Sequence, residues 1–212
     1  MKLYTYFRSS AAFRVRIALN LKGLAYEAQF VHLPRGEHRA PRYGAINPQA
    51  LVPTLDDDGR LLTQSLAIIE YLDETQPNTP LLPKDAPGRA RVRSLAMLIA
   101  CEIHPVNNLR ILQHLKRALG QNDEQVNAWY RHWIADGLVK LEADLTKAGG
   151  AGKFCHGDTP TMADCCLVPQ IFNAQRYQCD TAAYPTTMRV FAECMKLEAF
   201  DRAQPSMQPD AE

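Results

Sequence analysis

Two adjacent serines, Ser9 and Ser10, stand where a short apolar strand pattern (residues 2–6) gives way to a helical pattern (residues 12–21). The backbone N–H groups in the first turn of a helix have no partner within the helix, and the helix dipole adds partial positive charge there. A hydroxyl at this point is suited to hold an anion such as a thiolate. The alternative is simple helix capping, which serine also does well.

The composition narrows the classes of partner. The 212 residues carry 24 Lys and Arg against 23 Asp and Glu, so no global field favours nucleic acid or an anionic membrane. No apolar run approaches the roughly 18 to 20 residues that span a bilayer, and the first residues lack the apolar core of a signal peptide. We therefore expect a soluble, cytoplasmic protein.

The six cysteines form no C-x-x-C motif, and the histidines form no pair at zinc-finger spacing. We therefore expect neither a metal nor, in a reducing cytoplasm, a disulfide. The simplest interpretation of each cysteine is a small buried apolar residue.

Residues 1–80 alternate between strand and helix patterns. An apolar strand, a helix over 12–21 ending at Gly23, and a strand over 26–31 form a βαβ opening. A strand at V-P-T-L, a D-D-D-G turn, a strand at R-L-L-T and a helix over 64–74 follow. Pro53 cannot donate a hydrogen bond to a sheet, which places it at the start or edge of its strand, and a cis bond from Val52 is possible.

A proline-rich stretch then indicates a linker over 81–87, followed by a helical domain over 88–212. Helical periodicity covers residues 88–119, 123–147 and 161–177, with a bend expected at Pro105. Thr161 and Asp164 have the spacing of a capping box, which we interpret as a folding device and not as a catalytic acid.

Three segments carry a resemblance to a known family. R-S-S-A-A-F-R-V-R-I-A-L resembles the S-S-C-x-W-R-V-R-I-A-L signature of the zeta-class glutathione transferases, and N-P-Q-A-L-V-P-T-L and L-T-Q-S-L-A-I-I-E-Y-L resemble further segments of that class. The sequence departs from the signature at Ala11, where cysteine is usual, and at Phe13, where tryptophan is usual. The departure at Ala11 weakens any mechanism that uses a protein thiol and leaves glutathione as the thiol.

The resemblance implies a thioredoxin-like α/β domain over 1–80, an all-α domain over 88–212 and a homodimer. It also implies glutathione-dependent cis–trans isomerisation of maleylpyruvate, or of maleylacetoacetate, in aromatic catabolism; we prefer maleylpyruvate. Ser9 then stabilises the thiolate with Ser10 alongside. The implied glutathione ligands are His38, Gln49, Val52, Pro53, Gln64 and Ser65, and the implied ligands of the dianionic substrate are Arg8, His104, Asn108, Arg110 and Arg176.

Structural interpretations stand beside these. His38 and Gln49 could be solvated loop residues, His104 a neighbour of the proline bend, and Arg176 a cation that favours its helix end. Helical spacing puts His104 and Asn108 on one face, with Arg110 about 120° around. Arg14 and Arg16, inside the first helix, are interpreted as structural. Two other functions remain: a general glutathione-conjugating transferase and a non-enzymatic interaction module.

Overall fold

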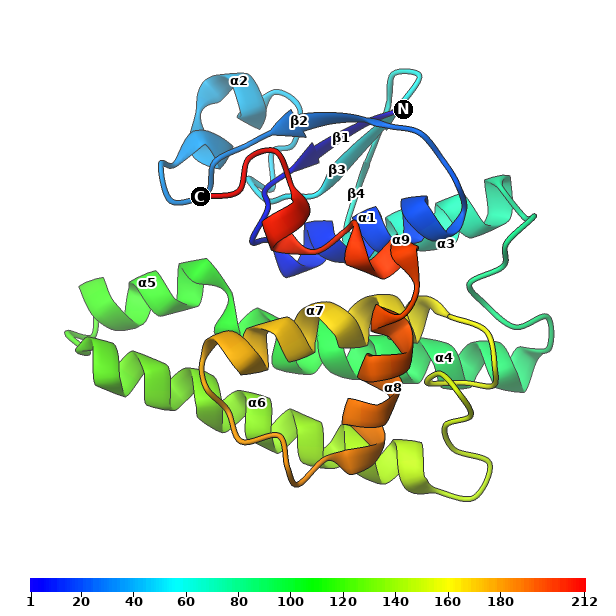
Figure 1. The fold of residues 1–212 in the computed structure, drawn as a ribbon. Coiled ribbons are helices and arrows are strands. Elements are labelled where there is room, and N and C mark those ends of the chain that lie inside the picture. Colours follow the sequence, from blue (N-terminus) through cyan, green and yellow to red (C-terminus); the bar gives the residue numbers. More distant parts are fainter. The chain divides into compact units, whose positions relative to one another are not determined.

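The computed structural model describes residues 1–212, and the chain divides into two compact units (Figure 1). Unit 1 comprises Met1–Leu81 together with Met195–Glu212, and unit 2 comprises Leu82–Cys194. We expected the helical domain to run to residue 212, but the last residues belong to unit 1. The reason is polar: Arg16 and Asn20, on the first helix, bind backbone carbonyls of this C-terminal segment.

A mixed four-stranded sheet forms the centre of unit 1, in the order β2-β1-β3-β4. Its strands are β1 (Lys2–Thr5), β2 (Glu27–Phe30), β3 (Thr54–Asp57) and β4 (Arg60–Thr63). β1 runs parallel to β2, as a βαβ unit requires, and antiparallel to β3, which forms an antiparallel hairpin with β4. Asp58 and Gly59 close the hairpin with φ of 52° and 87°, the conformation that a tight two-residue turn needs.

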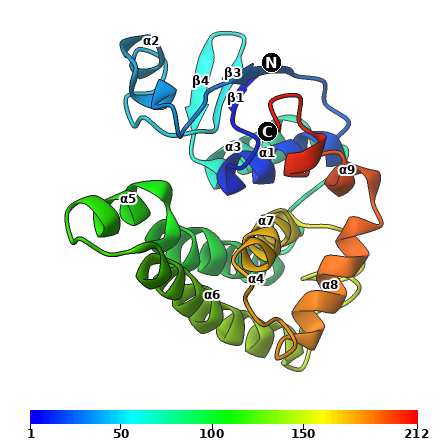
Figure 2. The same cartoon turned by 60° about the vertical axis from the view of Figure 1, so that its left-hand side comes forward.

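Helices α1 (Ser10–Leu21) and α3 (Ser65–Thr75) lie on one side of this sheet and contact each other (Figures 1 and 2). Most of α1 is buried because its apolar residues face several neighbours at once, including α9 (Glu198–Asp201). Unit 1 also contains the short elements η1 (Glu37–Arg39), α2 (Pro41–Gly44) and η4 (Pro205–Met207).

Unit 2 is helical throughout. Its elements are α4 (Ala86–Met97), η2 (Leu98–Ile103), η3 (Pro105–Asn107), α5 (Leu109–Arg117), α6 (Asp123–Thr146), α7 (Met162–Arg176) and α8 (Pro185–Met195). α4 packs against α7, and η2 packs against α6. At the second contact, a Cβ on Gly137 would lie 2.2 Å from the Ile103 side chain, so only glycine permits this approach.

The prediction of one helix over 88–119 with a bend was wrong, because four separate elements occupy this stretch. The turns widen first into the π-helix η2, in which the His104 N–H donates to the Ile99 carbonyl. Pro105 then has no N–H to continue the ladder, and a 3₁₀ turn ends the helix. Asn108 is extended and caps a new helix, α5. α8 was not predicted.

The capping box of α7 is formed and buried. As predicted, Asp164 reaches back to the Thr161 N–H, at 2.8 Å. Its carboxylate also accepts the Thr161 hydroxyl at 2.9 Å and the Cys155 N–H at 2.8 Å. Asp164 therefore joins the start of α7 to the preceding loop.

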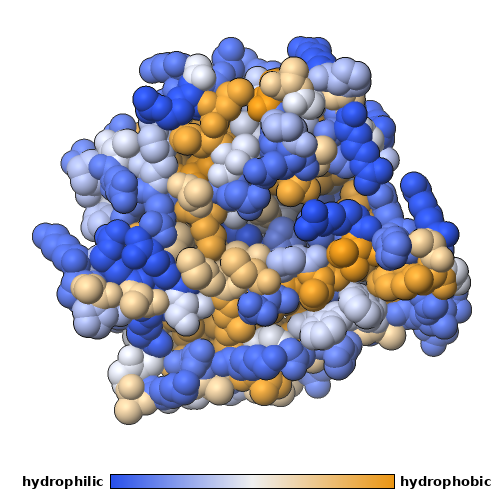
Figure 3. Space-filling view, turned by 180° about the vertical axis from the view of Figure 1, so that it is seen from behind, coloured by the Kyte–Doolittle hydropathy of each residue, from blue (hydrophilic) through white to orange (hydrophobic).

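The surface mixes polar and apolar residues: on the face in Figure 3, orange hydrophobic side chains lie among blue hydrophilic ones. The exposed large apolar residues are scattered along the chain, from Phe30 to Met207. None of the helices combines the length and the apolar character needed to cross a bilayer.

Candidate active site

Ser9 is the N-cap of α1 and is half-buried. Its Oγ accepts the Ala12 N–H at 3.2 Å, and its own N–H donates to the Tyr6 carbonyl at 2.9 Å. A serine hydroxyl that accepts one hydrogen bond still has its proton to donate. Ser9 is therefore a cap that can also bind an anion. Ser10, the first residue of the helix, is buried, and the Arg8 side chain is exposed with its guanidinium 4.9 Å from the Phe7 ring centre.

The Val52–Pro53 bond is cis, as the sequence allowed, and Val52 precedes the paired residues of β3. Two buried side chains hold the backbone before it. Tyr43 donates its hydroxyl proton to the Leu51 carbonyl at 2.6 Å, and Asn47 donates to the same oxygen at 2.8 Å. Neighbouring side chains therefore determine the position of this segment.

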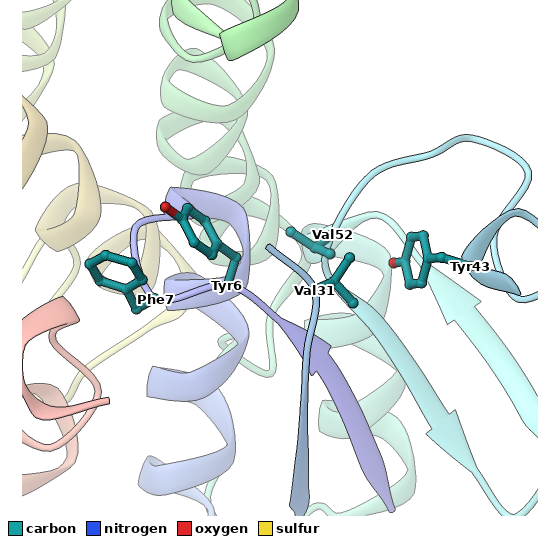
Figure 4. Close-up of a cluster of buried hydrophobic side chains, with 5 residues drawn as sticks. All are labelled: Tyr6, Phe7, Val31, Tyr43 and Val52. Atoms are coloured by element: carbon teal, nitrogen blue, oxygen red, sulfur yellow. The ribbon is translucent and has the colours of Figure 1, made fainter. Parts of the chain in front are cut away.

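Val52 also belongs to a cluster of buried side chains with Tyr6, Phe7, Val31 and Tyr43. Figure 4 shows Val52 beside Val31 and Tyr43, with Tyr6 and Phe7 coming from the end of β1. The cluster thus connects the backbone before Pro53 to the chain that leads into Ser9.

Gln64 and Ser65 stand at the start of α3, as predicted. The Gln64 amide donates to the Gln49 side-chain oxygen at 2.8 Å, so two of the proposed glutathione ligands are in contact. The buried Arg14 guanidinium donates to the Ser65 hydroxyl at 3.3 Å. Arg14, which we interpreted as structural, therefore places a cation at the N-terminus of α3.

His38 is buried, so the interpretation of this residue as a solvated loop side chain was wrong. Its Nδ1 atom is buried without a hydrogen-bond partner. Burial, and secondarily the charge of Arg39, lowers the pKa of His38, which favours the neutral ring. The structure thus leaves one buried imidazole nitrogen in unit 1 without a hydrogen-bond partner.

In unit 2 the predicted relation between His104, Asn108 and Arg110 does not hold. His104 follows the π-helix, whereas Asn108 caps α5 and its side chain accepts the Arg110 N–H at 3.2 Å. No single helical wheel contains all three, because Asn108 is extended and separates the elements before it from α5. The Arg110 side chain is exposed at the start of α5.

Arg176 is the last residue of α7 and is exposed. Its guanidinium lies 4.8 Å from the centre of the Tyr177 ring, which stacks on the Tyr130 ring at 3.5 Å. Arg176 also hydrogen-bonds the side chain of Tyr130, whose pKa is raised chiefly by burial. Two stacked rings thus orient the guanidinium and leave it exposed to bind a carboxylate.

The cysteines are all free, and four are buried as expected, whereas Cys101 is exposed and Cys179 half-buried. Burial raises the pKa of the Cys155 and Cys194 thiols, so neither is an activated nucleophile. No group of three or more His, Cys, Asp or Glu side chains could hold a metal ion.

Comparison with known proteins identifies the family. Residues 8–75 match the model of the glutathione S-transferase N-terminal domain. The chain is 49% identical to a maleylpyruvate isomerase of a Ralstonia species, over 100% of both chains. The chain belongs to the zeta-class glutathione transferases.

Two solved structures agree with this assignment. A bacterial zeta-class maleylpyruvate isomerase matches with a TM-score of 0.98 at 49% identity, covering 100% of both chains. A maleylacetoacetate isomerase from Anaeromyxobacter dehalogenans, with dicarboxyethyl glutathione and citrate in its active site, matches with a TM-score of 0.88 at 45% identity, covering 100% of this chain and 97% of that one. The fold is accordingly that of a glutathione transferase, with an α/β thioredoxin-like part and an all-α part.

Sequence reasoning missed several residues that contact the candidate site residues of this transferase. Tyr43 and Asn47 hold the segment before Pro53, Arg14 contacts Ser65, and Tyr130 binds Arg176. The signal for Asn47 was available, since an Asn-Pro pair before a strand is typical of a side chain that bonds the following backbone. Tyr130 is 46 positions from Arg176 in the sequence, and no local pattern connects them.

Proposed function

We propose that this protein is a glutathione-dependent cis–trans isomerase of maleyl keto acids and that it prefers maleylpyruvate to maleylacetoacetate. The observation that carries the proposal is the Ser9 hydroxyl at the N-terminus of α1, with a proton to donate and helix N–H groups beside it. The identities of 49% to a maleylpyruvate isomerase and 50% to a probable maleylacetoacetate isomerase support the substrate class, maleyl keto acids, and do not rank the two acids.

The groups of unit 1 fit the tripeptide. Gln64 and Ser65 stand at the start of α3, where Arg14 donates to the Ser65 hydroxyl. This pair suits the γ-glutamyl carboxylate. The Val52 backbone, before cis Pro53, suits the cysteinyl peptide group. His38 and the exposed Gln49 side chain are the proposed ligands of the glycine end. We propose unit 1, through residue 80, as the glutathione-binding domain, and the helices from residue 88 as the substrate-binding domain.

Glutathione would supply a thiolate whose addition to the cis double bond leaves a rotatable single bond, and whose expulsion after rotation restores a trans double bond. Ser9 donates its hydroxyl proton toward the sulfur, and the start of α1 adds partial positive charge. Both favour the thiolate over the thiol, whose ordinary pKa of about 8.5 would leave it mostly protonated at neutral pH. Ser10 stands beside Ser9 in the same turn.

The substrate carries two carboxylates, and planar guanidinium groups suit them. We assign one carboxylate to Arg176, which the stacked tyrosines orient, and the other to Arg8 or Arg110, which are both exposed. His104 and Asn108 complete the proposed set. A general conjugating transferase, which acts on apolar electrophiles, would not need these arginines.

The decisive experiment follows the absorbance of maleylpyruvate and of maleylacetoacetate with the enzyme, each with and without glutathione. We expect isomerisation of both acids only with glutathione, and a higher kcat/KM for maleylpyruvate. Glutathione without the enzyme gives the background isomerisation by the free thiol. Turnover at the full rate without glutathione would refute the proposal, and a higher kcat/KM for maleylacetoacetate would reverse the preference.

We also propose a cytoplasmic homodimer. The dimer rests on the resemblance to the zeta-class glutathione transferases, because single exposed apolar side chains such as Leu61 and Met97, at 44% and 45% of full exposure, also occur on monomers. The six free cysteines suit a reducing compartment. Sedimentation equilibrium tests the assembly: a single species at twice the chain mass is expected, and a concentration-independent monomer would exclude it.

A further inference from the structure

The buried guanidinium of Arg16 binds the turn that carries Ser9. It donates to the Thr5 hydroxyl at 3.1 Å, to the Tyr6 carbonyl at 3.3 Å and to the Phe7 carbonyl at 3.1 Å. The Tyr6 carbonyl accepts the Ser9 N–H as well. Burial lowers the pKa of Arg16 to about 10, with Tyr26 and Asp210 opposing the shift, so Arg16 remains a cation at neutral pH and its hydrogen bonds are charge-assisted.

The C-terminal segment binds the same turn. Nε of Arg16 donates to the Ala203 carbonyl at 3.0 Å, and the Asp210 carboxylate accepts the Phe7 N–H at 3.0 Å. Phe7 is therefore held at its carbonyl by Arg16 and at its N–H by Asp210. Beyond it, the Glu212 carboxylate contacts His32 at 3.1 Å and Arg35 at 2.8 Å, which fastens the end of the segment.

These bonds concentrate on the residues just before Ser9. Burying a guanidinium costs desolvation free energy, and a buried apolar side chain is often as stabilising. Stability alone therefore does not explain a buried arginine at this position. Here the buried cation and a carboxylate from the other end of the chain both bind the peptide groups of one residue, Phe7. Electrostatic stabilisation of an anion depends on donors fixed in advance, so the position of this turn matters for the chemistry.

We propose that Arg16 and Asp210 are positioning residues of this isomerase, which act through the peptide groups of Phe7 to hold the Ser9 hydroxyl and the start of α1 in the geometry that stabilises a thiolate. This inference rests on the proposed role of Ser9. It gives residues 203–212 a part in catalysis although none of them touches the reacting atoms.

The test compares Asp210→Ala with Asp210→Asn, using the full chain. Titration of the thiolate absorbance gives the pKa of enzyme-bound glutathione, and steady-state kinetics gives kcat and KM. We expect Asp210→Ala to raise the bound thiol pKa by about one unit and to lower kcat about 10-fold, with KM for glutathione within about 2-fold. Asp210→Asn keeps an oxygen that accepts the Phe7 N–H and should recover most of both values.

Asp201→Ala is the matched control in the same C-terminal segment, because this exposed carboxylate contacts only the Gln204 side chain. It should change neither value. Arg16→Lys, which lacks the fork needed to serve the Phe7 and Ala203 carbonyls together, should shift the thiol pKa in the same direction as Asp210→Ala. Circular dichroism establishes that each variant is folded.

Ser9→Ala, measured in parallel, separates the two proposals. If Ser9→Ala leaves the thiol pKa unchanged, the role of Ser9 fails. If Ser9→Ala raises it while Asp210→Ala lowers only the melting temperature, the role of Ser9 stands and the positioning inference is overturned. In the double variant, Asp210→Ala should add little to the effect of Ser9→Ala; fully additive shifts would also overturn the inference.

Discussion

Helices α1 and α7 both begin at a hydroxyl N-cap, yet their caps differ in what they leave available. Asp164 and Thr161 are buried, and the Asp164 carboxylate accepts two backbone N–H groups and a hydroxyl. Ser9 is half-buried and accepts one N–H, from Ala12, at 3.2 Å. The polar side chains at the start of α7 already make several hydrogen bonds within the protein, whereas the Ser9 hydroxyl at the start of α1 still has a proton to donate.

A capping sequence by itself does not distinguish a helix cap that only stabilises the fold from one that also binds an anion. The local physics is the same in both helices, since each N-terminus presents unpaired N–H groups and partial positive charge. Burial and the number of bonds already made decide the difference. In α7 the exposed polar group lies at the other end, at Arg176, where the negative end of the dipole favours a cation.

The largest effect is expected at that end of α7. Arg176→Ala leaves one carboxylate of a bound dianion unpaired. The fall in kcat/KM for the maleyl acid should correspond to a loss on the order of 2 to 5 kcal/mol of transition-state stabilisation. Conjugation of glutathione to a neutral aromatic electrophile, measured on the same variant, should scarcely change. Equal losses in both reactions would mean that Arg176 only supports the helix end. Arg176→Lys should recover part of the activity, since it keeps the charge without the fork.

The start of α7 should respond in stability and not in chemistry. Asp164→Ala leaves the N–H groups of Thr161 and Cys155 buried without their acceptor, and the free energy of unfolding should fall by about 2 to 4 kcal/mol. Denaturant unfolding measures this loss, while kcat per folded molecule should match the wild type. A large fall in kcat in the folded variant would place Asp164 in the chemistry and contradict the comparison.

The start of α1 should show the opposite pattern. Ser9→Ala removes a donor to the thiolate, so the pKa of bound glutathione should rise. The fall in kcat should correspond to a loss of about 1.5 to 3 kcal/mol of transition-state stabilisation. The lost cap should cost about 1 kcal/mol of stability. Titration of the bound thiolate and denaturant unfolding give both numbers on one variant. An unchanged thiol pKa would transfer the role to Ser10 or to the helix terminus.

Features of the fold and of the candidate site were predictable where the interacting residues lie close together in the sequence. The four strands, helices α1 and α3 and the Asp164 box were readable because each rests on neighbours within a few residues, whereas the short helices η1 and α2 were not predicted and the cis Val52–Pro53 bond was expected only as a possibility. A bend at Pro105 was expected, but the π-helix η2 before it, which packs against α6, and the new helix α5 after it follow no local pattern in the sequence. The pairing of Arg16 with the C-terminal segment joins residues 187 positions apart, and only the folded chain brings them together.

A third helix N-terminus, at α8, should give the smallest and most pH-dependent effect. The Glu142 carboxylate of α6 accepts the N–H groups of Thr186 and Thr187, both at 2.8 Å, and the Thr187 hydroxyl at 2.7 Å. Partial burial opposes ionisation, but these hydrogen bonds outweigh it and hold the pKa of Glu142 below its ordinary 4.5. Like Ser9, this carboxylate is not fully buried; like Asp164, it is saturated by its helix.

A carboxylate whose pKa is lower in the folded than in the unfolded state binds fewer protons when folded, so its stabilisation is complete above pH 4.5 and disappears as the pH falls below that value. Glu142→Gln keeps one acceptor oxygen but loses the charge. The difference in unfolding free energy between wild type and this variant should therefore be largest near neutrality and shrink toward about pH 3. Asp136→Asn is the matched control on α6, because Asp136 contacts the exposed Lys140, and an exposed pair of this kind contributes little. If the difference in unfolding free energy between wild type and Glu142→Gln stays constant with pH, the cap of α8 depends on a hydrogen-bond acceptor and not on its charge. The cap would then resemble the neutral hydroxyl of Ser9.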